Sequence, residues 1–138
     1  MSSGPRILIV DDEERFRTTL RKHLTVAGME ADTAGSGEDA LQQIRGKTYD
    51  VVLLDVKMPE MDGLEALARI KKIDPQVEVI MLTGHACLDV AVEIMKLGGY
   101  EYLLKPCPLD DLMAKIDAAY ERKLMRHGKR SRTDAAQS

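Results

Sequence analysis

Short runs of aliphatic and β-branched residues alternate along the chain with longer stretches in which apolar residues recur every three or four positions. Four runs are strongly apolar, and they cover residues 7–10, 51–54, 77–82 and 100–104. The first two are apolar at every position, which is typical of strands that helices cover on both faces of a parallel sheet. A weaker run at 30–34 alternates polar and apolar residues and predicts an edge strand.

The segments between these runs have apolar residues at the spacing of a helix. Phe16, Leu20 and Leu24 form one stripe, and Gly28 after it favours a helix C-terminus. Similar stripes lie within residues 40–44, 64–70, 90–97 and 109–119. Five β–α units in succession predict an α/β fold: an open five-stranded parallel sheet with helices on both faces and right-handed crossovers. Five units are too few for an eightfold barrel.

Length and charge suggest one domain with a basic end. The chain has 138 residues, which is enough to bury a core without disulfides or a structural metal. We expect a lead of residues 1–5, a domain over residues 6–124, and a basic tail of residues 125–138. The tail is expected to be flexible or to begin a linker to an output domain. A free polybasic arm and a continuation of the fifth helix are the alternatives.

Composition also bears on partners and location. Residues 126–138 carry a net charge of +3, whereas the preceding 125 residues carry −6, so no DNA-binding face is expected. The chain has no Trp and one Phe, which disfavours a stacking platform for single-stranded nucleic acid. No apolar stretch approaches the roughly 20 residues of a membrane span, and the start lacks a signal-peptide pattern. A cytoplasmic location without membrane contact is therefore expected.

Polar residues follow the central strands at the point where each strand ends. Asp11 and Asp12 follow the first strand, Asp55 the third, Thr83 the fourth and Lys105 the fifth. The carboxyl ends of parallel strands share one edge of a sheet, where open α/β folds bind their ligands, so these residues should form one pocket. Three neighbouring carboxylates repel each other unless a cation neutralises them, and Mg²⁺ is the expected ion.

The predicted pocket has the residues needed for phosphoryl transfer. A carboxylate can act as the nucleophile, while Mg²⁺ and a lysine ammonium neutralise the phosphoryl oxygens and a threonine hydroxyl donates a hydrogen bond. The chain has no Gly-x-x-x-x-Gly-Lys-Ser/Thr loop, so the donor is not expected to be a nucleotide. Taken singly, each residue has a plainer explanation. Thr83 could be a helix N-cap, and Tyr102 could be a core residue.

In order along the chain, these motifs resemble the receiver domain of bacterial two-component response regulators. The resemblance covers residues 6 to about 123. It rests on Asp11-Asp12, on the segment 54–63 with the sequence LDVKMPEMDG, on Thr83-Gly84, and on the segment 102–106 with the sequence YLLKP. It implies a flavodoxin-like open sheet with strand order 2-1-3-4-5.

The resemblance implies a role for each site residue. Asp55 would accept the phosphoryl group. Asp12 and Asp55 would bind Mg²⁺ directly, Asp11 often through water, and the backbone carbonyl of Lys57 would add a ligand. Lys105 would pair with the carboxylate and then with the phosphoryl group.

The same resemblance implies a switch. Thr83 would turn inward to a phosphoryl oxygen, and Tyr102 would rotate inward with it. The bond between Lys105 and Pro106 would be cis, and Gly63 would fit the loop after Asp55. The fourth helix, fifth strand and fifth helix would then signal to a partner.

Three functions remain in competition. The first is a signalling domain, not an enzyme, that is phosphorylated by a sensor histidine kinase or a phosphotransfer protein. A homodimer through the fourth helix, fifth strand and fifth helix is a possible assembly of such a domain. The second is a small Mg²⁺-dependent phosphatase acting through an aspartyl-phosphate. Lys57 stands where such enzymes place a second Asp, and the chain has no room for a cap domain. The third is an electron carrier, which lacks the expected phosphate-binding loop.

Overall fold

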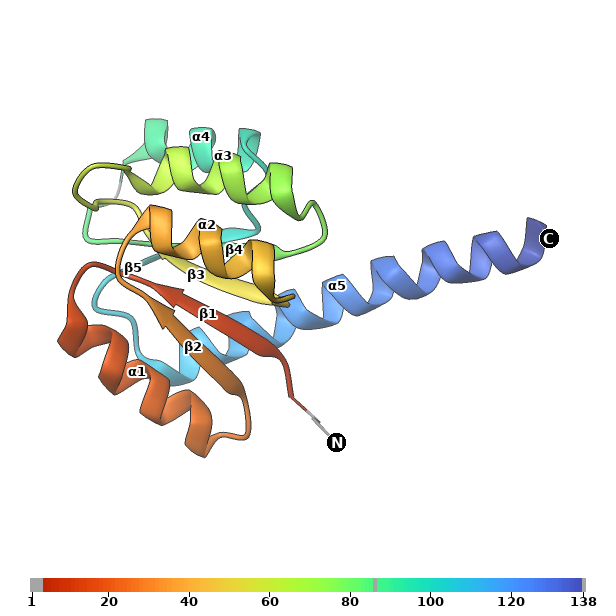
Figure 1. Ribbon diagram of the computed structural model, residues 1–138, viewed down its shortest axis with the longest axis horizontal. Helices are drawn as coiled ribbons and strands as arrows, with labels where there is room; N and C mark the ends of the chain where they lie inside the picture. The colour runs from red at the N-terminus through yellow and green to blue at the C-terminus, as the bar shows by residue number, and fades with distance from the viewer. Residues whose placement is uncertain (1–3, 86, 138) are drawn as a thin grey trace.

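A five-stranded parallel sheet forms the centre of the computed structural model, which describes residues 4–85 and 87–137, with side chains up to Arg126 (Figure 1). The strands are β1 (Arg6–Val10), β2 (Glu30–Ala34), β3 (Val51–Asp55), β4 (Glu78–Thr83) and β5 (Glu101–Leu104). Their order across the sheet is β2-β1-β3-β4-β5. This confirms the predicted flavodoxin-like fold and strand order.

Helices cover both faces of the sheet (Figure 1). They are α1 (Glu14–Val26), α2 (Gly37–Gly46), α3 (Gly63–Ile73), α4 (Leu88–Lys96) and α5 (Leu109–Gln137). One core cluster joins the sheet to α1 and α5, and a second joins it to α2, α3 and α4. Neighbouring residues of β1 therefore face opposite cores: Ile7 and Ile9 face α1 and α5, whereas Leu8 and Val10 face the other three helices.

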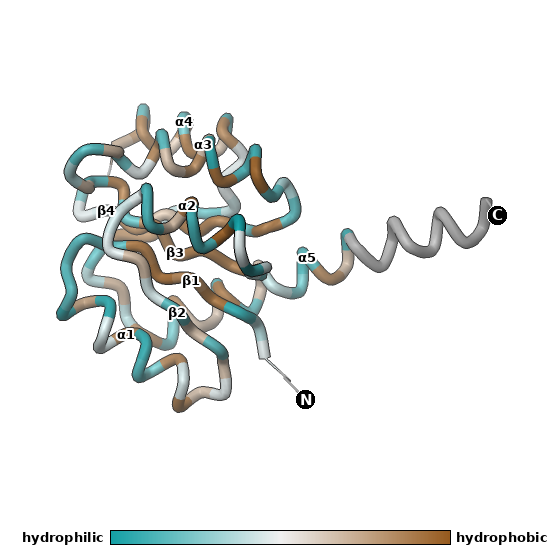
Figure 2. The backbone as a smooth tube through the Cα atoms, viewed as in Figure 1, coloured by the Kyte–Doolittle hydropathy of each residue, from teal (hydrophilic) through white to brown (hydrophobic). Residues whose placement is uncertain are grey.

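This double covering explains the apolar runs. Every residue of β3 and β4 is buried, and the hydrophobic colour in Figure 2 is concentrated on β1 and β3. The predicted edge strand β2 has two buried positions, one exposed position and two half-buried positions, in agreement with its alternating sequence. Gly28 has φ +92° and the backbone N–H of Met29 donates to the carbonyl of Leu24, so this glycine closes α1 as predicted.

Helix α5 extends beyond residue 124, where the domain was predicted to end. It continues past Leu124 without a break to Gln137, and its last turns project away from the body (Figure 1). Lys123 Nζ donates to Asp50 Oδ1 at 2.8 Å. Arg122 and Arg126 each lie 3.3 Å from Oε2 of Glu78, a carboxylate that is only 1% exposed. These pairs hold α5 at the amino ends of β3 and β4. That residues 125–138 lead into a linker stays a prediction.

Candidate functional site

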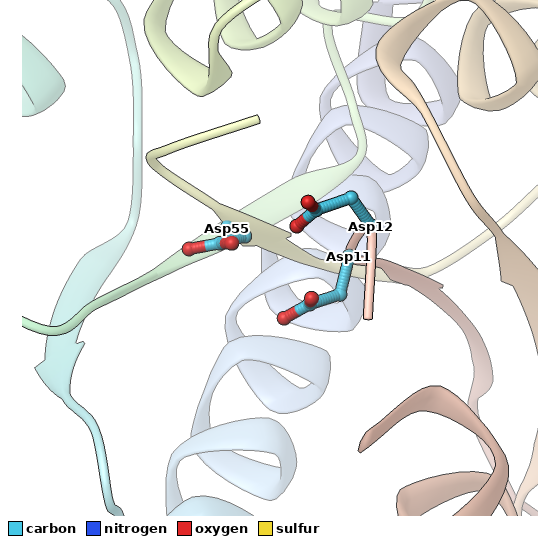
Figure 3. Close-up of side chains that lie close together, drawn as sticks. All are labelled: Asp11, Asp12 and Asp55. Atoms are coloured by element: carbon cyan, nitrogen blue, oxygen red, sulfur yellow. The ribbon is translucent and has the colours of Figure 1, made fainter. Parts of the chain in front are cut away.

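The strand ends bring the polar residues of the sequence pattern to one edge of the sheet. Asp55 is the last residue of β3, and Asp11 directly follows β1. Because β1 and β3 are neighbouring parallel strands with Val10 opposite Leu54, Asp11 and Asp55 lie side by side. The carboxylates of Asp11, Asp12 and Asp55 each offer an oxygen within 4.8 Å of the other two, as Figure 3 illustrates.

The three carboxylates fit a hard divalent cation. They supply only oxygen donors, Figure 3 shows the three side chains close together, and Asp12 remains exposed to solvent. Mg²⁺ prefers such carboxylate oxygens and keeps several of its waters. The geometry is therefore consistent with the predicted ion.

Asp11 already has protein partners on both carboxylate oxygens. Lys105 Nζ donates to its Oδ2 at 2.5 Å, and the backbone N–H of Glu13 donates to its Oδ1 at 2.9 Å. The residue is 1% exposed, so these donors compensate a buried negative charge. With both oxygens engaged, Asp11 is the least available of the three carboxylates for direct metal binding.

The surroundings of Asp55 disfavour the ionised form of its carboxyl group. Burial raises the pKa of the Asp55 carboxyl, and the negative charges of Asp11 and Asp12 act in the same direction. The ammonium of Lys105, 3.8 Å from Asp55 Oδ2, and the backbone N–H of Lys57 lower this pKa and only partly compensate. A divalent cation at the cluster would favour the ionised form of Asp55, which is the nucleophilic form.

Lys105 reaches the carboxylates from the loop after β5. Its peptide bond to Pro106 is cis, as the sequence resemblance implied. Its backbone N–H donates to the carbonyl of Thr83 at 2.7 Å, which fixes the start of this loop against the end of β4. Its ammonium also lies 4.3 Å from the ring centroid of Phe16. Sequence reasoning placed Phe16 only in a helix stripe and missed this contact.

Thr83 is buried at the end of β4, but its hydroxyl is occupied by the following loop. Oγ1 donates to the carbonyl of His85 at 3.1 Å and accepts the backbone N–H of His85 at 3.2 Å. Helix α4 begins at Leu88, and its N-cap residue is Cys87. The alternative that Thr83 is merely a helix N-cap is therefore wrong.

Tyr102 lies on the α4 side of the sheet, half-buried against the same core as α2, α3 and α4. It is opposite Met81 in the β4–β5 register, and Met81 is two residues before Thr83. Side chains two residues apart on a strand share a face, so Tyr102 and Thr83 belong to the same face of the sheet. Tyr102 also lines a surface hollow with Leu88, Val92 and other residues of α4.

The loop after Asp55 depends on a glycine. A Cβ at Gly63 would lie 2.2 Å from the backbone oxygen of Asp55, a distance that real structures do not tolerate. The Gly63 N–H donates to the carbonyl of Val56 at 2.8 Å and closes the loop. Lys57, whose carbonyl was expected to bind the metal, is an exposed residue of this loop.

Comparisons with known proteins agree with this geometry. The response regulator receiver domain family matches residues 7–117. The transcriptional regulatory protein ZraR of Escherichia coli K12 is 40% identical over 113 residues, which are 82% of this chain and 26% of ZraR. The DNA-binding transcriptional regulator NtrC of Klebsiella pneumoniae is 42% identical over 111 residues, covering 80% of this chain and 24% of NtrC.

A solved structure supports the same assignment. The CheY-like response regulator receiver domain protein of Methanospirillum hungatei JF-1 superposes with a TM-score of 0.86 and 31% identity, covering 90% of this chain and 99% of that one. The chain belongs to the response regulator receiver domain family, whose members are signalling domains of two-component systems. Phosphorylation on Asp and binding of Mg²⁺ at the acidic pocket are general in this family.

The chain spans about a quarter of the length of the curated relatives it matches. NtrC is named as a DNA-binding regulator, so the expectation that nucleic acid is not a partner gains no support from the comparisons. Within the described residues, no helix has the length and hydropathy needed to cross a bilayer.

Proposed function

We propose that Asp55 accepts a phosphoryl group from a phosphohistidine on a sensor kinase or a phosphotransfer protein. The observation that carries this proposal is the meeting of three carboxylates and one ammonium at the carboxyl edge of the sheet. Asp12 and Asp55, with Asp11 through water and the Lys57 carbonyl, would hold Mg²⁺. The bound ion would neutralise charge on the transferring group.

In the transfer step, a carboxylate oxygen of Asp55 attacks the phosphorus. The P–N bond of the phosphohistidine breaks, and the leaving imidazole takes up a proton from solvent. Lys105 lies 3.8 Å from Asp55, within reach of a phosphoryl oxygen on that carboxylate. Moving its ammonium from Asp11 toward the phosphoryl group would stabilise the acyl phosphate. Hydrolysis of the same acyl phosphate by water would return the domain to its starting state.

The signal would pass through Thr83 and Tyr102 to α4, β5 and α5. The Thr83 hydroxyl would leave the His85 backbone for a phosphoryl oxygen, and Tyr102 would move on the same face of the sheet. Four large apolar side chains are exposed on this side of the molecule: Leu88, Val92, Met95 and Leu104. Such a patch suits a protein partner, either a second copy of the chain or an output domain. The place of action would be the cytoplasm.

The test uses a small acyl phosphate as the donor and measures intact mass. With Mg²⁺, the wild-type protein is expected to gain a single phosphoryl group, and Asp55→Asn is expected to gain none. Asp62→Asn is a matched control, because Asp62 is an exposed helix N-cap outside the cluster. A phosphorylated Asp55→Asn protein, or an unmodified wild type at saturating donor, would contradict the proposal.

The same preparation separates the switch from the phosphatase alternative. A switch is modified about once and releases phosphate slowly, whereas a phosphatase turns over a phosphomonoester many times. Rapid release of inorganic phosphate from a phosphomonoester would favour the phosphatase.

A further inference from the structure

The ammonium of Lys105 lies close to two carboxylates and to one aromatic ring. Two carboxylates lie on one side, with Asp11 Oδ2 at 2.5 Å and Asp55 Oδ2 at 3.8 Å. The ring of Phe16 lies on another side, with its centroid 4.3 Å from Nζ. This ring comes from α1, whereas Lys105 comes from the loop after β5, so the contact joins two elements that are distant in sequence.

An aromatic ring at this distance attracts a cation through the negative potential of its face. The attraction is strongest where water is partly excluded, and Lys105 has a side chain that is 24% exposed. A lysine side chain has several rotatable bonds, so a carboxylate contact alone leaves it many alternative conformations. A ring beneath the ammonium removes part of that freedom and keeps Nζ near the carboxylates.

Phe16 packs against the core cluster that joins the sheet to α1 and α5, and it also faces open space. Phe16 is half-buried, and it borders a hollow of about 180 Å³ between α1 and α5. The ring and Lys105 both line this hollow.

We infer that Phe16 is a positioning residue for the phosphoryl-transfer reaction: its ring holds the Lys105 ammonium at Asp11 and Asp55. This inference rests on the proposed function, because it assigns to Phe16 an effect that is exerted through Lys105. Phe16 is the single phenylalanine of the chain, and its replacement removes the ring that lies against Lys105.

The first experiment is a double-mutant cycle on the rate of Asp55 phosphorylation by a small acyl phosphate with Mg²⁺. Phe16→Leu keeps an apolar side chain but removes the ring face, and it is expected to slow phosphorylation about three- to tenfold. Phe16→Tyr keeps the ring face and is expected to restore the rate to within about twofold of wild type. In the Lys105→Met background, Phe16→Leu should have no further effect, because the cation is gone.

Two rate outcomes would overturn the inference. The first is an unchanged rate in Phe16→Leu. The second is an equal loss with and without Lys105, which would indicate a general structural effect.

The second experiment reads the geometry without any phosphorylation. The ring current of Phe16 is expected to shift the NMR signals of the Lys105 Hε protons upfield, and Phe16→Leu should abolish this shift. Unshifted Hε signals in the wild type would overturn the inference even if the variants phosphorylate at the expected rates. If the wild type shows the ring-current shift but is never phosphorylated, the proposed function fails and the contact stands.

Discussion

Replacing Lys105 by Met should destabilise the protein strongly in the absence of Mg²⁺. The change leaves Asp11, which is 1% exposed, with a buried negative charge, and among the described residues only the backbone N–H of Glu13 still donates to its carboxylate. Breaking a buried ion pair costs about 3–5 kcal/mol. Because the Lys105 side chain is 24% exposed, solvent screens part of the pair, and we expect a loss of about 2–3 kcal/mol.

Mg²⁺ should reverse part of this loss. In the wild type, the ammonium and the metal compete for the same carboxylates, so the variant should bind Mg²⁺ more tightly. A ligand at one hundred times its dissociation constant stabilises the folded state by about 2.7 kcal/mol. Urea denaturation of both proteins, with and without MgCl₂, measures the two effects.

Lys115→Met provides the matched control. Lys115 pairs with Glu101 at 3.0 Å, but the two side chains are 42% and 35% exposed. A surface pair of this kind contributes about 0–1 kcal/mol, and its loss should not respond to Mg²⁺. The reasoning is refuted if Lys105→Met costs no more than Lys115→Met, or if Mg²⁺ stabilises Lys105→Met less than the wild type.

Three further predictions concern other parts of the site and its support. The pKa of Asp55 is raised above 3.8, so the folded state binds this proton more tightly than the unfolded state, and stability is lost as pH rises through the raised value. Without Mg²⁺, Asp55→Asn should therefore have a higher melting temperature than the wild type at neutral pH. The difference in melting temperature should shrink as the pH falls toward 3.8. An equal or lower melting temperature of Asp55→Asn at neutral pH would contradict the electrostatic account. Gly63→Ala should lose about 2 kcal/mol or more in urea denaturation, because the methyl group meets the Asp55 backbone, whereas Gly46→Ala, with nothing within 4 Å, should lose none. Replacing both Arg122 and Arg126 by Gln removes the two arginine partners of the buried Glu78 carboxylate, and should destabilise by about 2 kcal/mol and speed trypsin cleavage after Lys123; unchanged cleavage would argue against anchoring of α5.

Much of the fold could be predicted because burial imposes a simple pattern on the sequence. Strands such as β3 are covered on both faces, so every position has to be apolar until Asp55 at the strand end. Gly28 could be assigned for a similar local reason, since a positive φ favours glycine. The convergence of Asp11 and Asp55 followed from the rule that parallel strands end at one edge.

The remaining features depend on contacts between distant residues. Glu78 stands at the start of an apolar strand, and its buried carboxylate is paired with arginines 44 and 48 positions later in α5. The Phe16–Lys105 contact spans two elements and has no signature in either segment. The Thr83 hydroxyl bonds to the His85 backbone, a local turn that the sequence did not distinguish from a helix cap.

The central claim is that Asp55 itself carries the phosphoryl group. Borohydride reduces an aspartyl phosphate to homoserine, which marks the modified position permanently in the peptide chain. After incubation with a small acyl phosphate and Mg²⁺, peptide mapping of the reduced protein should locate homoserine at position 55, with Asp11 and Asp12 unchanged. Homoserine at another aspartate, or none in a protein that gained a phosphoryl group, would contradict the account.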